Sequence, residues 1–283
     1  MERKLDRKLI FLVIDGRILI PGKVVGREVI EGLRKTRNRG HQIFICTGRA
    51  VSVLPAELDD LTWDGVIASA GSDIWIHGQN VYRGSLEVGQ IRKACGLLEK
   101  MGAVYVLEGY DHMYVCGFGR KLLLDQISPE DINPEMARWR QFFRQKKNVR
   151  SYEEWEPEQT PIPKVTFMLW GKKKLEQLEA ELRNDFYMAL FQTESGDFFN
   201  GELISLKDNK GTAIRRTADL LNADIKDTIA FGDSMNDYQM IEAAEVGVAM
   251  GNADEKVKEI ADRVCESVEE DGVIRELERM GII

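Results

Sequence analysis

Residues 228–237 read Thr-Ile-Ala-Phe-Gly-Asp-Ser-Met-Asn-Asp, and they carry the clearest signal in the chain. An apolar run ends at Gly232-Asp233, and a second acid, Asp237, stands at the start of a predicted helix. Two carboxylates on one tight turn offer the oxygen ligands that Mg²⁺ prefers. The same residue types also form an ordinary turn followed by a helix N-cap. From this stretch alone, a metal site and a structural turn are equally good interpretations.

Two earlier stretches show the same pattern, an apolar strand that ends in small or polar residues. Residues 9–14 run into Asp15-Gly16, and residues 41–46 run into Thr47-Gly48. Each pair is also a common turn sequence, so neither indicates a site by itself. In an open parallel sheet, however, ligands bind outside the carboxyl ends of the strands. We therefore expect these polar residues to meet at one edge of a sheet.

Lys210 completes a set of groups that suits a phosphoryl ligand. It stands at the start of a predicted helix, where a lone lysine is usually a surface residue. Together, however, Thr47 offers a hydroxyl, Lys210 a positive charge, and the acids at positions 233 and 237 a place for a metal. These groups neutralise the charge of a phosphoryl group. The sequence therefore predicts a small phosphorylated molecule and Mg²⁺ at the carboxyl edge of the sheet.

Strands and helices alternate at both ends of the chain, which predicts parallel pairing with right-handed crossovers. In the middle, short turns join several strands, as in an antiparallel sheet with helices on one face. We expect an α/β fold with a Rossmann-like parallel-sheet core, residues 1–84 and 199–283, and an inserted α+β domain, residues 85–198. The expected strands are 9–14, 41–46, 65–69, 228–231 and 246–250 in the core, and 103–107, 113–116, 165–170 and 186–192 in the insertion.

The composition excludes several classes of protein. Of 283 residues, 43% are hydrophobic and 30% charged, which excludes wholesale disorder. The net charge of −8 argues against non-specific nucleic-acid binding. The apolar run at residues 9–14 is too short for a membrane span or a signal peptide, so we expect no membrane partner. Four scattered cysteines indicate reduced thiols and a cytoplasmic location, and three distant histidines argue against zinc.

Several motifs occur together in this chain: Thr47 after the second strand, Lys210-Gly211, Gly-Asp-Ser-Met-Asn-Asp at residues 232–237, Val-Ala-Met-Gly-Asn-Ala at 248–253, and Glu-Asp-Gly-Val at 270–273. With these motifs the chain resembles the haloacid dehalogenase superfamily, in its Cof-type branch with a large α/β cap. The resemblance covers essentially the whole chain, and the insertion falls where that branch carries its cap. It implies Mg²⁺-dependent hydrolysis of a phosphoric monoester, with a ligand chosen by the cap.

The resemblance breaks at the end of the first strand. In such enzymes this strand ends in Asp-x-Asp-Gly-Thr, whose first Asp attacks phosphorus and whose second Asp acts as general acid and base. Aligned on Asp15-Gly16, the nucleophile position holds Val13 and the Thr position holds Arg17. The Asn-Gly that follows the third strand in the family is Ala70-Gly71 here. Valine has neither a nucleophilic atom nor a lone pair for a metal.

The resemblance implies a role for each remaining residue of the site. The catalytic residues are Asp15, Thr47 and Lys210, with Val13 at the nucleophile position. The substrate-binding residues are Thr47, Gly48, Lys210, Arg17 and Asn236. The Mg²⁺ ligands are Asp15 through its carbonyl, Asp233 and Asp237. Arg17 has two interpretations, since its guanidinium suits a phosphate but would equally pair with Asp233 and fill the place of the metal.

Three functions remain open at this point. In the first, the protein binds a small phosphorylated metabolite, or a protein partner, but is impaired or inactive as a hydrolase. In the second, it is an active Mg²⁺-dependent phosphatase of a sugar phosphate or similar metabolite, with Asp15 or a water as nucleophile. In the third, it is a non-catalytic interaction protein. Removal of a hydrolase nucleophile costs on the order of 10⁶ in rate, which favours the first.

Overall fold

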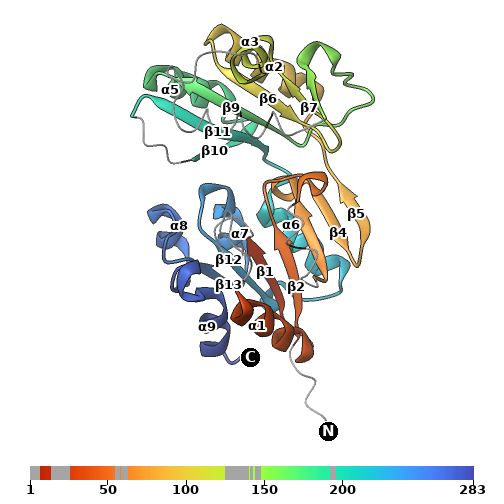
Figure 1. Ribbon diagram of the computed structural model, residues 1–283, viewed down its shortest axis with the longest axis vertical. Helices are drawn as coiled ribbons and strands as arrows, with labels where there is room; N and C mark the ends of the chain where they lie inside the picture. The colour runs from red at the N-terminus through yellow and green to blue at the C-terminus, as the bar shows by residue number, and fades with distance from the viewer. Residues whose placement is uncertain are drawn as a thin grey trace. The chain divides into compact units, whose positions relative to one another are not determined.

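The computed structural model describes residues 7–13, 26–54, 58, 63–124, 140, 143, 148–191 and 196–283. The chain divides into two compact units. The core unit comprises Met1–Arg83 and Lys207–Ile283, and the cap unit comprises Gly84–Leu206. Each unit is built on a sheet of its own (Figure 1). The predicted fold class, a parallel-sheet core with a second sheet in an insertion, is confirmed.

The core unit contains, within the described residues, an eight-stranded sheet in the order β14-β13-β12-β1-β2-β3-β4-β5. Pairing is parallel from β14 to β3 and antiparallel from β3 to β5. The central strands are apolar along their length because helices cover both faces of the sheet. The strands are β1 (Leu9–Val13), β2 (Gln42–Cys46), β3 (Gly65–Ala68), β4 (Asp73–Ile76), β5 (Gln79–Arg83), β12 (Thr228–Gly232), β13 (Val246–Ala249) and β14 (Arg263–Val264).

Alternate residues of β1 show how the two faces are covered. Ile10 and Leu12 pack with α1 and α9, whereas Leu9, Phe11 and Val13 pack with α6, α7 and α8. This period of two is the ordinary consequence of strand geometry. The Val13 side chain therefore lies on the α6 face. The helices are α1 (Arg27–Asn38), α6 (Lys210–Leu220), α7 (Tyr238–Ala243), α8 (Glu255–Ile260) and α9 (Gly272–Arg279).

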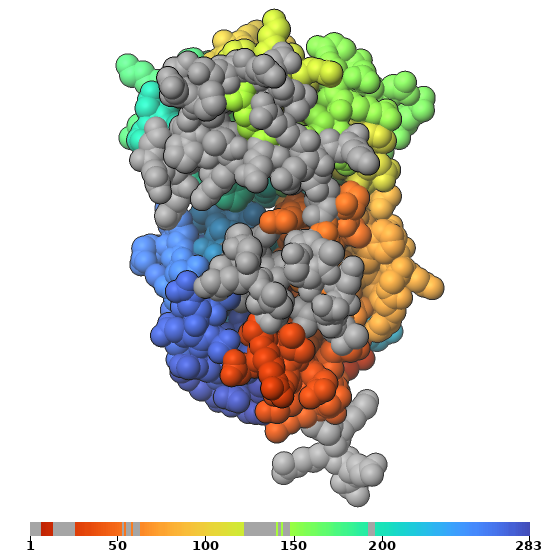
Figure 2. Space-filling model, viewed as in Figure 1, coloured from red at the N-terminus to blue at the C-terminus, as the bar shows by residue number. Residues whose placement is uncertain are grey.

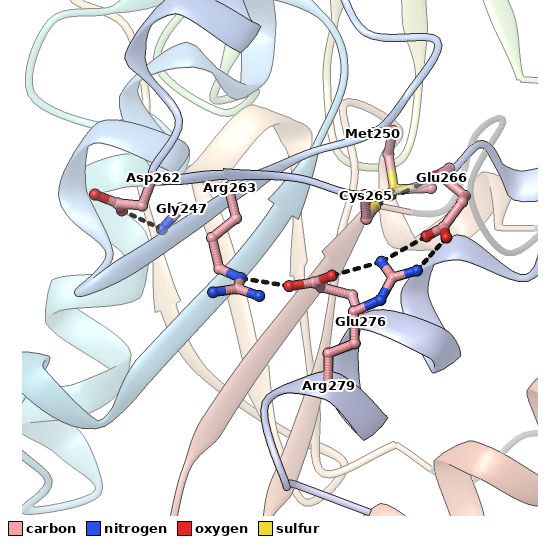
Figure 3. A network of polar contacts seen from close by, with 8 residues as sticks. All are labelled: Gly247, Met250, Asp262, Arg263, Cys265, Glu266, Glu276 and Arg279. Carbon is pink, nitrogen blue, oxygen red and sulfur yellow. Dashed lines mark hydrogen bonds and ion pairs between the residues drawn. The ribbon is translucent and has the colours of Figure 1, made fainter.

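Ion pairs hold α9 against the edge of the core sheet (Figure 3). Arg279 binds both Glu266 and Glu276, and Arg263 of β14 also binds Glu276. The Glu276 side chain is buried, so two guanidinium groups compensate its charge. These contacts support a short edge strand whose two residues are exposed. In Figure 2 the C-terminal elements, drawn in blue, lie on the visible face of the core unit.

The antiparallel hairpin of β4 and β5 extends the core sheet beyond the predicted strands. Its turn consists of His77 and Gly78, and Ile76 pairs directly with Gln79. Both turn residues have positive φ, +50° and +77°, as the type I′ turn of a two-residue hairpin requires. A two-residue turn with Gly second, directly after the apolar residues of β4, is the signal that would have predicted this hairpin.

The cap unit contains, within the described residues, a six-stranded sheet in the order β10-β11-β9-β6-β7-β8. The predicted hairpin between residues 103 and 116 is confirmed as β6 and β7. Among the described strands of this sheet, the β7–β8 pair alone is parallel. None of the described helices of the protein is long and apolar enough to cross a membrane. The elements are α2 (Val88–Lys100), α3 (Gly117–Leu124), α5 (Lys172–Leu182), β6 (Val104–Glu108), β7 (Met113–Val115), β8 (Val149–Ser151), β9 (Lys164–Trp170), β10 (Phe186–Phe191) and β11 (Phe198–Ser205).

The chain returns to the core unit later than we predicted. We placed the boundary between residues 198 and 199, but β11 crosses this point and pairs along its length with β9 and β10. The hydrogen bonds of these ladders keep residues 199–205 in the cap unit, which extends to Leu206. Asn200, Gly201 and Glu202 make β11 a weak strand signal in the sequence. Gly201 is required by space, because an added Cβ would lie 2.8 Å from the Ala189 carbonyl oxygen.

Candidate functional site

The ends of parallel strands bring several predicted site residues to one edge of the core sheet. Val13 is the last residue of β1 and pairs with Cys46, the last residue of β2. Thr47 and Asp233 follow directly after β2 and β12, the two strands that flank β1. All three positions therefore lie at the carboxyl edge, where parallel α/β sheets bind their ligands.

Asp237 is the centre of the hydrogen bonding at this edge. Its Oδ1 accepts from the Lys210 ammonium in a salt bridge between two side chains with no solvent exposure. Its Oδ2 accepts from the backbone N–H groups of Asp233 and Ser234 and from the Ser234 hydroxyl, each at 3.1 Å. Asn236 Oδ1 accepts from Lys210 Nζ at 3.0 Å. The structure thus brings together Lys210, Asp233, Asn236 and Asp237.

Two glycines allow this close packing. A Cβ at Gly232 would lie 2.7 Å from the Asp237 Cβ, so only glycine lets the Asp237 side chain fold back over the end of β12. A Cβ at Gly211 would lie 2.3 Å from the Gln239 carbonyl oxygen, so Gly211 lets the first turn of α6 approach α7. Gly211 and Gly232 are therefore required for the close packing that brings Lys210 and Asp237 together.

The Thr47 hydroxyl closes the turn that follows β2. Its Oγ1 accepts from the Arg49 N–H at 3.1 Å across Gly48, which forms the turn typical of Ser and Thr side chains. The Ser69 N–H then donates to the Arg49 carbonyl at 2.8 Å. Thr47 is fully buried. The predicted binding residues Thr47 and Gly48 are thus held by the loop after β3.

This loop also connects Thr47 to Lys210. The Ala70 N–H donates to the Thr47 carbonyl at 3.0 Å. Gly71 has a φ of +108°, and a Cβ there would lie 2.2 Å from the carbonyl carbon of Asn209. Asn209 is the N-cap of α6, whose first residue is Lys210. Ala70 itself has a φ of +56°, a left-handed conformation that is strained for a residue with a Cβ.

Val13 is part of the apolar core at the edge of the site. It is 4% exposed and packs with residues of β2, α6 and α7. Its neighbour in the sheet, Cys46, is not a substitute nucleophile. Burial raises the pKa of the Cys46 thiol well above its ordinary value, while the charge of Lys210 lowers it and that of Asp237 raises it. A protonated thiol does not attack phosphorus.

The described residues do not assemble the donor set of a tightly held Mg²⁺. Mg²⁺ requires a near-octahedral shell of oxygens. Both carboxylate oxygens of Asp237 accept hydrogen bonds from the protein, and Val13 offers no lone pair. In the described part of the chain, no three His, Cys, Asp or Glu side chains gather into a group that would hold a metal. Of the three predicted metal ligands, Asp15, Asp233 and Asp237, the structure describes only Asp233 and Asp237.

Two of the predicted site residues, Asp15 and Arg17, lie outside the described residues, as does the alternative pairing of Arg17 with Asp233. One residue of the site was missed. The Ser234 hydroxyl lies within hydrogen-bond distance of both Asn236 Oδ1 and Asp237 Oδ2, between which its one hydrogen is shared, and so orients the two side chains that contact Lys210. The Ser-x-x-Asp spacing, which resembles a capping box, is the signal that would have identified it.

Comparison with known proteins adds three relatives. Residues 10–277 match the family described as haloacid dehalogenase-like hydrolase. Phosphatase YwpJ of Bacillus subtilis (strain 168) is 30% identical over 94% of this chain and 97% of its own length. From the same organism, 5-amino-6-(5-phospho-D-ribitylamino)uracil phosphatase YwtE is 29% identical over 94% of this chain and 95% of its own. A solved haloacid dehalogenase-like hydrolase from B. subtilis is 26% identical, with a TM-score of 0.79, over 96% of this chain and 99% of its own.

Proposed function

The chain belongs to the haloacid dehalogenase-like hydrolases, and from that premise we propose that it binds a small phosphorylated metabolite but hydrolyses it poorly or not at all. One observation carries this proposal. Val13 stands in the apolar core at the end of β1, while the buried Lys210–Asp237 pair is intact. Groups that hold a phosphoryl ligand are thus retained, and the group that would attack it is not.

In this proposal the chain's own residues bind the anion. The Lys210 ammonium has three N–H groups, and the described residues accept from two of them. We propose that the third donates to a phosphoryl oxygen when the ligand is bound. Asp237 and Asn236 fix the direction of the ammonium. The Thr47 hydroxyl oxygen accepts a hydrogen bond from the Arg49 N–H. In this proposal the hydroxyl hydrogen is donated to the phosphoryl group.

The chemistry of hydrolysis is where the chain departs from its family. Covalent catalysis needs a group that forms a bond to phosphorus. Valine cannot form one, and in a hydrolase such a loss costs on the order of 10⁶ in rate. Phosphatases of this family generally use Mg²⁺. We propose that this chain holds Mg²⁺ weakly, because one carboxylate ligand is missing from the set.

The ligand that we propose is a phosphorylated sugar, sugar alcohol or similar metabolite. YwtE is named for a phosphorylated ribitylamino compound, which is a ligand of this class. We also propose a cytoplasmic location and no nucleic-acid or membrane partner. Four buried free thiols, Cys46, Cys95, Cys116 and Cys265, support this location because thiols stay reduced there. Fractionation of cells that produce the protein would test the location.

A thermal-shift screen tests the binding proposal. Phosphorylated metabolites are compared with their unphosphorylated counterparts, and the expected result is a higher Tm with some phosphorylated compounds only, since a ligand of the folded state stabilises it. Thr47→Val is the matched variant, because it keeps the shape of a buried side chain and removes the hydroxyl. It should reduce the shift. If no phosphorylated compound changes the Tm, a non-catalytic interaction role replaces this proposal.

An active phosphatase is the second candidate, and the names of the relatives favour it. In that case Asp15 or a water would attack phosphorus. A screen of the protein against many phosphate monoesters in the presence of Mg²⁺ distinguishes the two candidates. Turnover of any of them at an ordinary enzymatic rate would favour the second.

A further inference from the structure

We infer that this chain binds a phosphate group without help from a divalent metal. The inference rests on the proposed function, because it concerns the same edge of the core sheet. Its basis is the disagreement between the Mg²⁺ that the family implies and the side chains that are present there.

The first step concerns charge at position 13. Strand β1 lies between β12 and β2, so a carboxylate at its end would stand next to the motifs that begin at Thr47 and Asp233. Its charge would repel a phosphate dianion unless a cation lay between them. Val13 carries no charge and is packed among apolar side chains. The substitution therefore removes one ligand of the metal and, with it, the repulsion that the metal would offset.

The second step concerns the groups that remain. The charge of Asp237 is compensated by Lys210, and both side chains are fully buried. The backbone of the turn also donates to Asp237, so this acid is satisfied without a metal. Lys210 thus neutralises Asp237 within the protein. An acid at position 13 would add a further negative charge to the described part of these motifs.

Thermodynamic linkage gives the measurable consequence. If the metal does not help phosphate to bind, then phosphate does not help the metal to bind either, because coupling between two ligands is reciprocal. The affinity for phosphate should be the same with and without Mg²⁺. An ordinary member of the family, with a carboxylate at this position, should lose affinity for phosphate when the metal is removed.

Isothermal titration of the whole protein with inorganic phosphate tests this, once with excess EDTA and once with MgCl₂. The expected dissociation constants agree within about threefold. A constant more than about tenfold weaker in EDTA would overturn the inference and leave the proposed function standing. If phosphate fails to bind in either buffer, the proposed function itself is overturned, and the inference with it.

Two variants test the cause. Val13→Asp should make phosphate binding depend on the metal, with a loss of more than about tenfold in EDTA that Mg²⁺ restores. Val13→Asn introduces a side chain of nearly the same shape as aspartate but without its charge. Phosphate binding to this variant should therefore stay independent of Mg²⁺. Equal behaviour of the two variants would refute the charge argument. Circular dichroism checks that each variant is folded. If a variant does not fold, the titrations of the unaltered protein in EDTA and in MgCl₂ still decide whether phosphate binding depends on the metal.

Discussion

Lys210 and Asp237 form an ion pair from which solvent is excluded, and this makes each side chain dependent on the other. Removal of one partner of a buried pair leaves the other charge without compensation, which typically destabilises a protein by about 3–5 kcal/mol. We predict that Lys210→Met lowers the free energy of unfolding by an amount in this range. Urea denaturation measures it.

The control for this prediction is a surface pair. Arg27 and Glu31 lie on α1 at 2.8 Å, with the arginine side chain 89% exposed. Arg27→Met should leave the urea midpoint almost unchanged, because exposed ion pairs are screened by water and salt. If Lys210→Met has as little effect as Arg27→Met, the buried pair does not hold the site together in the way we describe.

At the scale of the element, the loop Ser69–Gly71 is pressed against the N-terminus of α6. Gly71→Ala should destabilise the protein by about 2 kcal/mol or more, since it combines a left-handed conformation with a backbone clash. Gly40→Ala is the matched control, because Gly40 has a φ of +88° with nothing within 4 Å of its added Cβ. Gly40→Ala should therefore lose only the stability that the left-handed conformation costs an alanine. Equal losses in urea denaturation would show that the contact with α6 contributes nothing.

A charged cluster lies within the sheet of the cap unit. Lys164 of β9 binds Glu202 of β11 and lies 3.3 Å from Glu108 of β6, to which the Thr166 hydroxyl donates. Glu202 Oε2 has no hydrogen-bond partner within the described part of the chain. Burial raises the pKa of Glu108, Lys164 lowers it and Glu202 raises it, with a net upward direction. For Lys164, burial lowers the pKa, but the two acids outweigh it and raise the value overall.

The raised pKa of Glu108 makes stability depend on pH. The folded protein keeps a proton that the unfolded chain releases above the ordinary value of 4.5. Stability from this proton is therefore complete below that pH and is lost as pH rises through the higher folded value. Glu108→Gln should flatten the fall of Tm as the pH rises above the ordinary value of 4.5. Glu176→Gln, at an exposed position on α5, should keep the slope of the unaltered protein. An unchanged slope in Glu108→Gln would contradict this account.

Elements with strong local patterns were predictable, and those that depend on distant partners were not. The apolar runs of β1, β2 and β12 identify buried parallel strands without any other information. Strand β11 contains Asn200, Gly201 and Glu202, and it becomes a strand because β9 and β10 supply partners on both sides. Tertiary contacts override weak propensity in such a case. The hairpin of β4 and β5 was missed for a different reason, an unrecognised turn at His77-Gly78.

At the scale of the whole molecule, the order of motifs along the chain predicted the division into a core and an insertion, because an insertion interrupts the strand–helix alternation. The contacts of the site were predictable only in part. Residue types at strand ends and at the helix starts that follow them indicated that Lys210, Asp233 and Asp237 would meet, since parallel strands end at one edge. The sequence did not show that both oxygens of Asp237 accept hydrogen bonds within the protein. That depends on the close approach permitted by Gly232.

The central claim is that Val13 leaves this protein with a phosphate site and little or no hydrolysis. Steady-state turnover of p-nitrophenyl phosphate in Mg²⁺ tests it most directly, with the unaltered protein beside the double variant Val13→Asp with Arg17→Thr. We predict very low turnover for the unaltered protein and an increase of several orders of magnitude in the variant, because the attacking carboxylate is restored. Turnover by the unaltered protein at about 1 s⁻¹ or faster, within the ordinary range of enzymes, would contradict the account.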